Sequence, residues 1–151
     1  MAALPVTSYT TQFQVEIAAK QKAVWKAMTR DIRKWWPTHF HSSEKTRAFV
    51  METEVGGRVY EDYGSGEGAE WGRLIVFQPH DKLVWTGSHF GGNGKNWGQF
   101  YVTILLEEQG KVTVLKFEDS GFGMLDEGLP SSLEAGWKEL YGTHLKNYLE
   151  E

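Results

Sequence analysis

Two acidic residues and one histidine are the side chains of this sequence best placed to do chemistry. Asp119 continues an alternation of apolar residues that includes Leu115 and Phe117, so we expect its carboxylate on the inner face of a strand. An unpaired carboxylate in such a place has a raised pKa and can act as an acid or a base. The alternative is that Asp119 ends its strand and caps the turn that begins at Ser120.

Glu61 and His144 are the other two candidates. Glu61 shares its strand parity with Val59, which predicts a second inward carboxylate; a solvated position on the sheet is the alternative. His144 follows Trp137 by seven residues, on the expected inward stripe of the last helix. It is either a ligand-facing general base or a satisfied core histidine. We interpret Asp119, Glu61 and His144 as a polar pocket end that orients a ligand rather than transforms it.

The remaining polar clusters do not predict a cofactor. His39, His41 and Glu44 are of metal-ligand type, but they lie in a loop without a fixed scaffold, so no metal is expected. The glycine-rich segments 64–68 and 91–95 lack the helix that follows a phosphate-binding loop. Cysteine is absent, which excludes disulfides, thiolate chemistry and cysteine-ligated metals.

Strands dominate the pattern between two helical regions. Apolar and polar residues alternate over 12–17, as in a half-buried strand. Helical spacing predicts short helices over 20–29 and 31–36, the second N-capped by Asp31 and stopped by Pro37. The other predicted elements are strands over 47–55, 58–63, 71–78, 83–90, 98–107 and 112–119, turns that include 91–94, a loop over 120–128 and a helix over 130–149.

These elements predict one α+β domain over residues 1–151. Short connections make the strands an antiparallel meander, because parallel pairing needs long crossovers. A twisted seven-stranded sheet with one long helix buries its concave face by laying that helix across it. The helix stripe expected to face the sheet consists of Leu133, Trp137, Leu140, Tyr141, His144 and Tyr148.

Composition excludes several classes of partner. The net charge of -4, without a local basic cluster, argues against nucleic acid. No apolar run approaches the roughly 20 residues of a membrane span. Residues 1–11 lack the pattern of a secretory signal, so we expect a cytoplasmic protein. Aromatic residues make up 14% of the chain, with seven tryptophans, and such rings line a core, a cavity or a partner surface.

Four landmarks in a fixed order carry a resemblance to a known superfamily. They are VW at 24–25 with DIRKWWP at 31–37, GGRV at 56–59, WGRL at 71–74 with LVWT at 83–86, and DSGF at 119–122 ahead of GW at 136–137. From about residue 9 to residue 150 the chain resembles the START-like, or SRPBCC, superfamily. Within it the chain is similar to the group named after the activator of heat-shock-protein ATPase, alongside polyketide-cyclase-like proteins.

The resemblance implies a helix-grip fold, in which a long C-terminal helix and two short helices accompany a curved seven-stranded antiparallel sheet. It also implies an apolar pocket between sheet and helix. Asp119 stands where many relatives have histidine, and Gly87 lies near their usual strand tryptophan, so no catalytic set carries over. The residues expected around the pocket are Trp35, Trp36, Phe40, Met51, Val59, Glu61, Trp71, Leu74, Trp85, Val102, Phe117, Asp119, Trp137, Tyr141 and His144.

We therefore expect the pocket to bind a small hydrophobic molecule: a lipid, a polyketide or an aromatic compound. One alternative is a cyclase or hydratase that uses the same acid–base groups. Another is a co-chaperone-like module that binds a protein ATPase through its surface. Trp35 and Trp36 are either a gate at the pocket mouth or a plug under two short helices, and Trp97 is expected to be exposed. The oligomeric state, a homodimer included, is left open.

Overall fold

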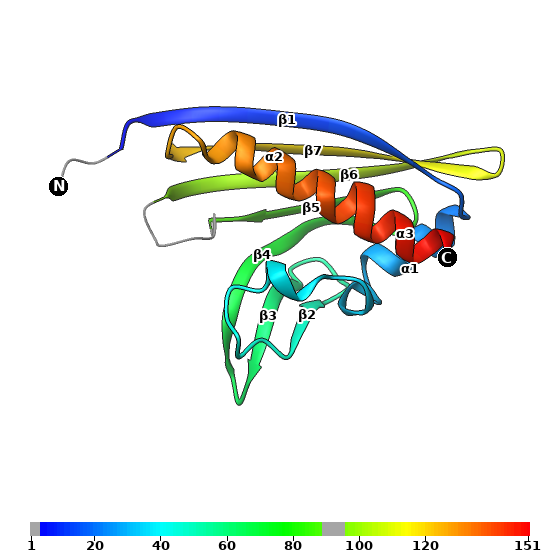
Figure 1. The fold of residues 1–151 in the computed structure, drawn as a ribbon, viewed down its shortest axis with the longest axis horizontal. Helices are drawn as coiled ribbons and strands as arrows, with labels where there is room; N and C mark the ends of the chain where they lie inside the picture. Colours follow the sequence, from blue (N-terminus) through cyan, green and yellow to red (C-terminus); the bar gives the residue numbers. More distant parts are fainter. Residues whose placement is uncertain (1–3, 89–95) are drawn as a thin grey trace.

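The computed structural model of the protein describes residues 4–88 and 96–151 and has a curved antiparallel sheet crossed by a long helix (Figure 1). The seven strands lie in the order β1-β7-β6-β5-β4-β3-β2, so the predicted α+β helix-grip fold is confirmed. The elements are β1 (Val6–Ile17), α1 (Gln21–Met28), the 3₁₀ turns η1 (Ile32–Lys34) and η2 (Thr38–Phe40), β2 (Ala48–Met51), β3 (Arg58–Gly64), β4 (Glu67–Gln78), β5 (Lys82–Gly87), β6 (Trp97–Gln109), β7 (Val112–Met124), α2 (Leu129–Glu139), the π-helical η3 (Leu140–Leu145) and α3 (Lys146–Glu150).

The alternating burial along strand β7 identifies the inner face of the sheet. It pairs along its length with β1 on one side and with β6 on the other. Leu115, Phe117 and Asp119 are all buried, whereas Lys116 and Glu118 between them point to the opposite face, as strand geometry requires. The predicted inward orientation of Asp119 is confirmed.

The C-terminal helical segment covers this inner face and runs 22 residues without a break from α2 through η3 to α3 (Figure 1). Pro130 lies in its first turn, as predicted. The inward stripe consists of Trp137, Leu140, Tyr141 and Leu145. Within the described residues, no helix is both long and apolar enough to cross a membrane.

The predicted stripe was wrong at its C-terminal end. His144 is only half-buried and Tyr148 is 37% exposed, while Leu145 takes the inward position. The reason is the π-helical turn, whose hydrogen bonds span five residues and so shift the inward face by one position. Regular α-helical spacing cannot anticipate such a turn.

The second short helix predicted over 31–36 forms only in part, as the single 3₁₀ turn η1. Asp31 makes no capping hydrogen bond. Its carboxylate instead lies 3.7 Å, 3.7 Å and 3.6 Å from cationic nitrogens of Lys26, Arg30 and Lys34, respectively. The segment is held by aromatic packing, since Trp36 stacks on Phe49 with ring centroids 3.8 Å apart.

Several strand ends differ from the predicted ones. β2 is shorter than predicted, β4 begins four residues earlier, and β7 continues five residues past Asp119 into the predicted loop. Gly121 allows β7 to continue pairing with β1 in this segment. A Cβ at position 121 would lie 2.7 Å from the ring of Tyr9, its partner on β1, so a larger residue would not fit. The strand end predicted at 89–90 and the turn at 91–94 lie outside the described residues.

Gly87 offers a test of how closely β4 and β5 approach. A Cβ at Gly87 would lie 2.0 Å from the carbonyl oxygen of Trp71 and 3.0 Å from the ring of Phe100. We expect Gly87→Ala to lower the free energy of unfolding by about 1–3 kcal/mol, as overpacking does. Gly128→Ala is the matched control, because a Cβ there has no neighbour within 4 Å. Urea unfolding of both variants measures this, and equal stabilities would contradict the close approach.

Candidate functional site

A cavity of about 230 Å³ lies between the inner face of the sheet and α2. Its walls come from β1, β4, β6, β7, η2 and the C-terminal helical segment, so no single element forms it. One carboxylate, that of Asp119, lies among mainly aromatic and aliphatic side chains. The lining consists of Tyr9, Phe40, Trp71, Phe100, Asp119, Leu129, Ser132, Leu133, Gly136, Trp137 and Leu140.

Asp119 is held by donors from two other elements. The Tyr9 hydroxyl on β1 donates to one carboxylate oxygen at 2.9 Å. The indole Nε1–H of Trp137 on α2 donates to the other oxygen at 2.8 Å. The carboxylate therefore joins β7 to both the neighbouring strand and the covering helix, and its position is well defined.

Burial dominates the electrostatics of this group. Removal from water raises the pKa of Asp119 from 3.8 to about 6, and the hydrogen bonds from Trp137 and Tyr9 oppose that rise by stabilising the charged form. Burial, followed by the nearby Asp119 charge, raises the pKa of the Tyr9 hydroxyl far above its usual range. Tyr9 thus remains a hydrogen-bond donor at any ordinary pH.

The carboxylate has spare accepting capacity towards the cavity. Each oxygen can accept about two hydrogen bonds, and each accepts one from a protein donor. Among the described residues, no lysine, arginine or histidine forms an ion pair with Asp119. A hydroxyl or amine in the cavity would satisfy the remaining positions and offset part of the desolvation cost.

Glu61 is fully buried but belongs to a separate, satisfied network. One of its oxygens accepts from the Ser42 backbone N–H and the Thr46 hydroxyl, both at 2.7 Å. The other accepts from the indole of Trp71 at 2.6 Å. Glu61 therefore fastens the loop before β2 and the neighbouring strand β4 to β3, and it does not line the cavity.

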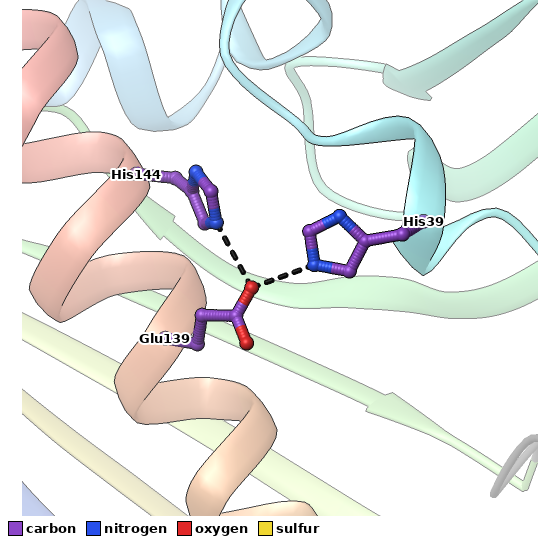
Figure 2. A group of neighbouring side chains, drawn as sticks. All are labelled: His39, Glu139 and His144. Atoms are coloured by element: carbon purple, nitrogen blue, oxygen red, sulfur yellow. Dashed lines mark hydrogen bonds and ion pairs between the residues drawn. The ribbon is translucent and has the colours of Figure 1, made fainter.

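His144 is also separate from Asp119. Its Nε2 lies 3.0 Å from the Glu139 carboxylate, close to His39, and its side chain is 31% exposed. His39 meets Glu139 rather than His41 and Glu44, at 2.6 Å (Figure 2). The three residues that the sequence places together thus lie in three clusters.

Four of the other predicted pocket residues have a clear place in or near the cavity: Phe40, Trp71 and Trp137 line it, and Trp85 packs edge-on against Trp137 with centroids 5.9 Å apart. The rest form the surrounding core. These core residues are Trp35, Trp36, Met51, Val59, Leu74, Val102, Phe117 and Tyr141. Trp35 and Trp36 are buried, which fits the plug rather than an open gate.

Four of the lining residues that were not predicted had usable signals in the sequence. Tyr9 has the same parity on β1 as Val15 and Ile17, both of which are buried. Phe100 has the same parity on β6 as Val102. Leu133 and Leu140 were placed on the inward helix stripe, and only their contact with the cavity was missing from the prediction.

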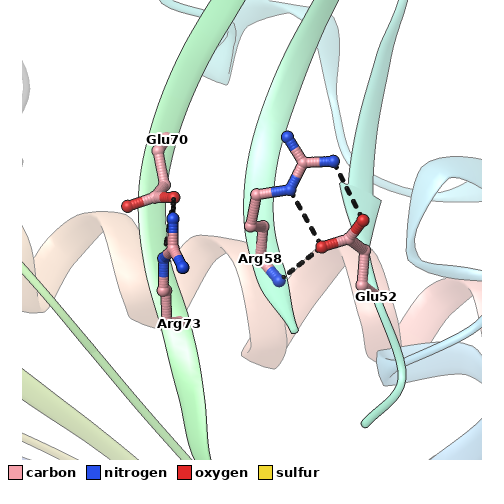
Figure 3. A network of polar contacts seen from close by, with 4 residues as sticks. All are labelled: Glu52, Arg58, Glu70 and Arg73. Atoms are coloured by element: carbon pink, nitrogen blue, oxygen red, sulfur yellow. Dashed lines mark hydrogen bonds and ion pairs between the residues drawn. The ribbon is translucent and has the colours of Figure 1, made fainter. Parts of the chain in front are cut away.

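Two acid–arginine pairs lie on or next to β3 and β4, apart from the cavity (Figure 3). Arg58 donates from Nε and Nη2 to the two oxygens of Glu52, each at 2.9 Å. The hydrogen bonds from the Arg58 side chain and backbone lower the pKa of Glu52 to about 2. Arg73 similarly bonds Glu70, with Nη2 3.0 Å from the carboxylate. Both acids are therefore held in ion pairs with arginine.

Comparison with known proteins identifies the family. Residues 18–150 match the profile of Activator of Hsp90 ATPase homolog 1-like protein, and the chain belongs to this family. The match confirms the resemblance seen in the landmark residues. No curated protein shows significant sequence similarity to the chain.

Solved structures share the fold at low identity. DynU16, a protein of the dynemicin biosynthetic locus, superposes with a TM-score of 0.67 at 23% identity over 93% of this chain, which spans 47% of the DynU16 chain. Mll3558 from Rhizobium loti gives 0.70 at 17% identity, covering 91% and 95% of the two chains. The Aha1 dimer from Colwellia psychrerythraea gives 0.65 at 18% identity, covering 94% and 96%.

The raised pKa of Asp119 predicts a particular pH dependence of stability. Because the folded state favours the protonated acid, the stabilisation is present at low pH and is lost as pH rises from about 4 through about 6. Relative to Asp119→Asn, the native protein should lose about 2 kcal/mol of unfolding free energy between pH 4 and pH 7. Urea unfolding of both proteins across this range measures the difference. A difference that stays constant, or that grows in favour of the native protein, would contradict the burial of a charged Asp119.

Proposed function

We propose that the protein binds a small apolar molecule carrying a hydroxyl or amine in the cavity at Asp119. The observation that carries this proposal is a single desolvated carboxylate at the wall of an otherwise apolar cavity. Ligand sites have this composition, with apolar walls and a few placed polar groups that set orientation. An acid that is buried for structural reasons alone does not need a cavity beside it.

The cavity limits the size and charge of the ligand. A cavity of roughly 150 Å³ holds benzene, so about 230 Å³ suits a molecule of about two fused rings. Trp71, Phe100 and Trp137 supply ring faces and edges for stacking. An anionic group facing Asp119 would place two like charges in a dry site, which is strongly unfavourable.

Family and fold support this proposal. The resemblance to the SRPBCC superfamily implies pockets for lipids, polyketides and other apolar molecules. DynU16, with the same fold, is encoded in a biosynthetic locus. A biosynthetic small molecule is thus a reasonable ligand class, within the size limit that the cavity sets.

An enzyme of the cyclase or hydratase type is a second candidate. The pKa of about 6 lets Asp119 accept a proton at neutral pH and return it within the same site. Glu61 and His144 cannot assist directly, since both bond to other partners. Any acid–base chemistry here would therefore depend on Asp119, with Tyr9 as a neutral donor.

A protein partner is a third candidate, carried by exposed apolar residues on the outer face. Val6, Trp97 and Phe122 are 74%, 61% and 53% exposed near one end of β1, β6 and β7, and the exposure of Trp97 was predicted. An apolar surface of this kind suits a second copy or another protein. The fold relative from Colwellia psychrerythraea is a dimer.

A cytoplasmic location stays a prediction.

The polar preference of the cavity can be tested with two probes that share one ring system. We expect 2-naphthol to bind and 2-naphthoate to bind at least about 10-fold more weakly, since a discrimination of 1.4 kcal/mol is the minimum that charge repulsion should give. Isothermal titration calorimetry measures both affinities. Asp119→Asn should narrow the difference, because it removes the charge and retains a polar side chain. Equal affinities in the native protein would contradict the proposed role of Asp119.

The location of binding can be tested by filling the cavity. Gly136 lines it, and a Cβ there would sit 3.5 Å from the Phe40 ring, in ordinary contact. Gly136→Leu should abolish 2-naphthol binding without loss of stability, because leucine also has the higher helix propensity. Ala135→Leu is the matched control, since Ala135 is exposed on the same helix. If Gly136→Leu binds like the control, the ligand lies elsewhere.

A further inference from the structure

We propose that His39, Glu139 and His144 form a binding site for a divalent transition metal, with Zn²⁺ the best match. The three side chains converge on one point (Figure 2), and none of them is among the residues that line the cavity. One ligand atom from each residue can be chosen so that all lie within 4.8 Å of one another. Two imidazoles and one carboxylate are a known zinc ligand set, which leaves a fourth position for water or another ligand.

The convergence is a product of the tertiary fold. His39 lies on η2 and Glu139 at the end of α2, 100 residues away in sequence. Nε2 of His39 lies 2.6 Å, and Nε2 of His144 3.0 Å, from the same Glu139 oxygen. The two rings meet edge to face with centroids 5.7 Å apart. Both imidazoles are therefore aimed at one point.

The π-helical turn η3 is what aligns two of the ligands. Glu139 and His144 are five residues apart, and in a regular α-helix they would point about 140° away from each other. Hydrogen bonds that span five residues bring them to the same side. The same turn that removes His144 from the inward stripe thus brings it to Glu139.

The charges and exposure around the three residues suit a cation. Glu139 supplies a carboxylate to which both imidazoles are hydrogen-bonded. The neighbouring lysines turn elsewhere, Lys138 to Glu134 at 2.8 Å and Lys146 to Glu150 at 2.9 Å. The side chains of His39, Glu139 and His144 are 59%, 44% and 31% exposed, which leaves an open path from solvent.

Metal binding requires only small side-chain movements. Zinc bonds of about 2.0–2.2 Å in a tetrahedron place ligand atoms about 3.3 Å apart. The observed hydrogen bonds of 2.6 Å and 3.0 Å must therefore lengthen slightly, and the imidazole nitrogens must approach each other. Exposed side chains can make such shifts by rotation. The ion would then tie η2, which carries the cavity residue Phe40, to the helix that covers the cavity.

The test uses untagged protein freed of metal with a chelator. Titration with Zn²⁺ against a chromophoric chelator should give one equivalent per chain, and Co²⁺ should give visible bands typical of four-coordinate nitrogen and oxygen ligation. His39→Ala, His144→Ala and Glu139→Gln should each weaken binding by about 10-fold or more. Zn²⁺ should raise the Tm of the native protein and not that of the variants.

His41→Ala is the matched control, because it removes a histidine two residues from His39 that is not part of the cluster. It should bind Zn²⁺ like the native protein. The proposal is overturned if no equivalent binds, if His41→Ala weakens binding as much as His39→Ala, or if His144→Ala leaves the affinity unchanged. Binding of 2-naphthol by the metal-free protein is a separate readout, so failure of the metal site and failure of the ligand site are distinguishable.

Discussion

The buried carboxylate of Asp119 is the constraint around which this structure is arranged. A charge removed from water must be compensated, and the only compensation among the described residues comes from the Tyr9 hydroxyl and the Trp137 indole. Those two donors belong to β1 and α2, so satisfying the acid also fixes an edge strand and the covering helix. Glycine at position 121 leaves room for the Tyr9 side chain, because any larger residue there would displace the Tyr9 ring.

The two buried acids, Glu61 and Asp119, differ in the number of their hydrogen-bond donors and in their access to the cavity. Glu61 and Asp119 each accept a hydrogen bond from a tryptophan, and the two indoles, Trp71 and Trp137, lie in edge contact with centroids 6.5 Å apart. Glu61 has three donors and no access to the cavity, so it serves as a structural anchor. Asp119 has two donors and lines the cavity. Residual accepting capacity, more than burial, is what distinguishes Asp119 from Glu61 and supports the proposed ligand site.

How much of the fold and of the site could be predicted from sequence depends on what a pattern of residues can show. Parity along a strand gives the face of each side chain, and it placed both Asp119 and Glu61 inside. It does not give the partner, so Glu61 was assigned to the pocket although Ser42 and Thr46 satisfy it. His144 was misplaced because a π-helical turn leaves no regular spacing to detect. The meeting of His39 with Glu139 depends on how η2 packs on the helix, which no local pattern contains.

The most direct test of the account is the indole N–H signal of Trp137 in ¹⁵N-labelled protein during addition of 2-naphthol. Trp137 donates to Asp119 and lines the cavity, whereas Trp97 is exposed on the outer face. The account predicts that the signals of Trp137 and Trp71 shift in a saturable manner while that of Trp97 stays in place. A saturable shift confined to Trp97, or no shift at Trp137, would contradict a ligand site at Asp119.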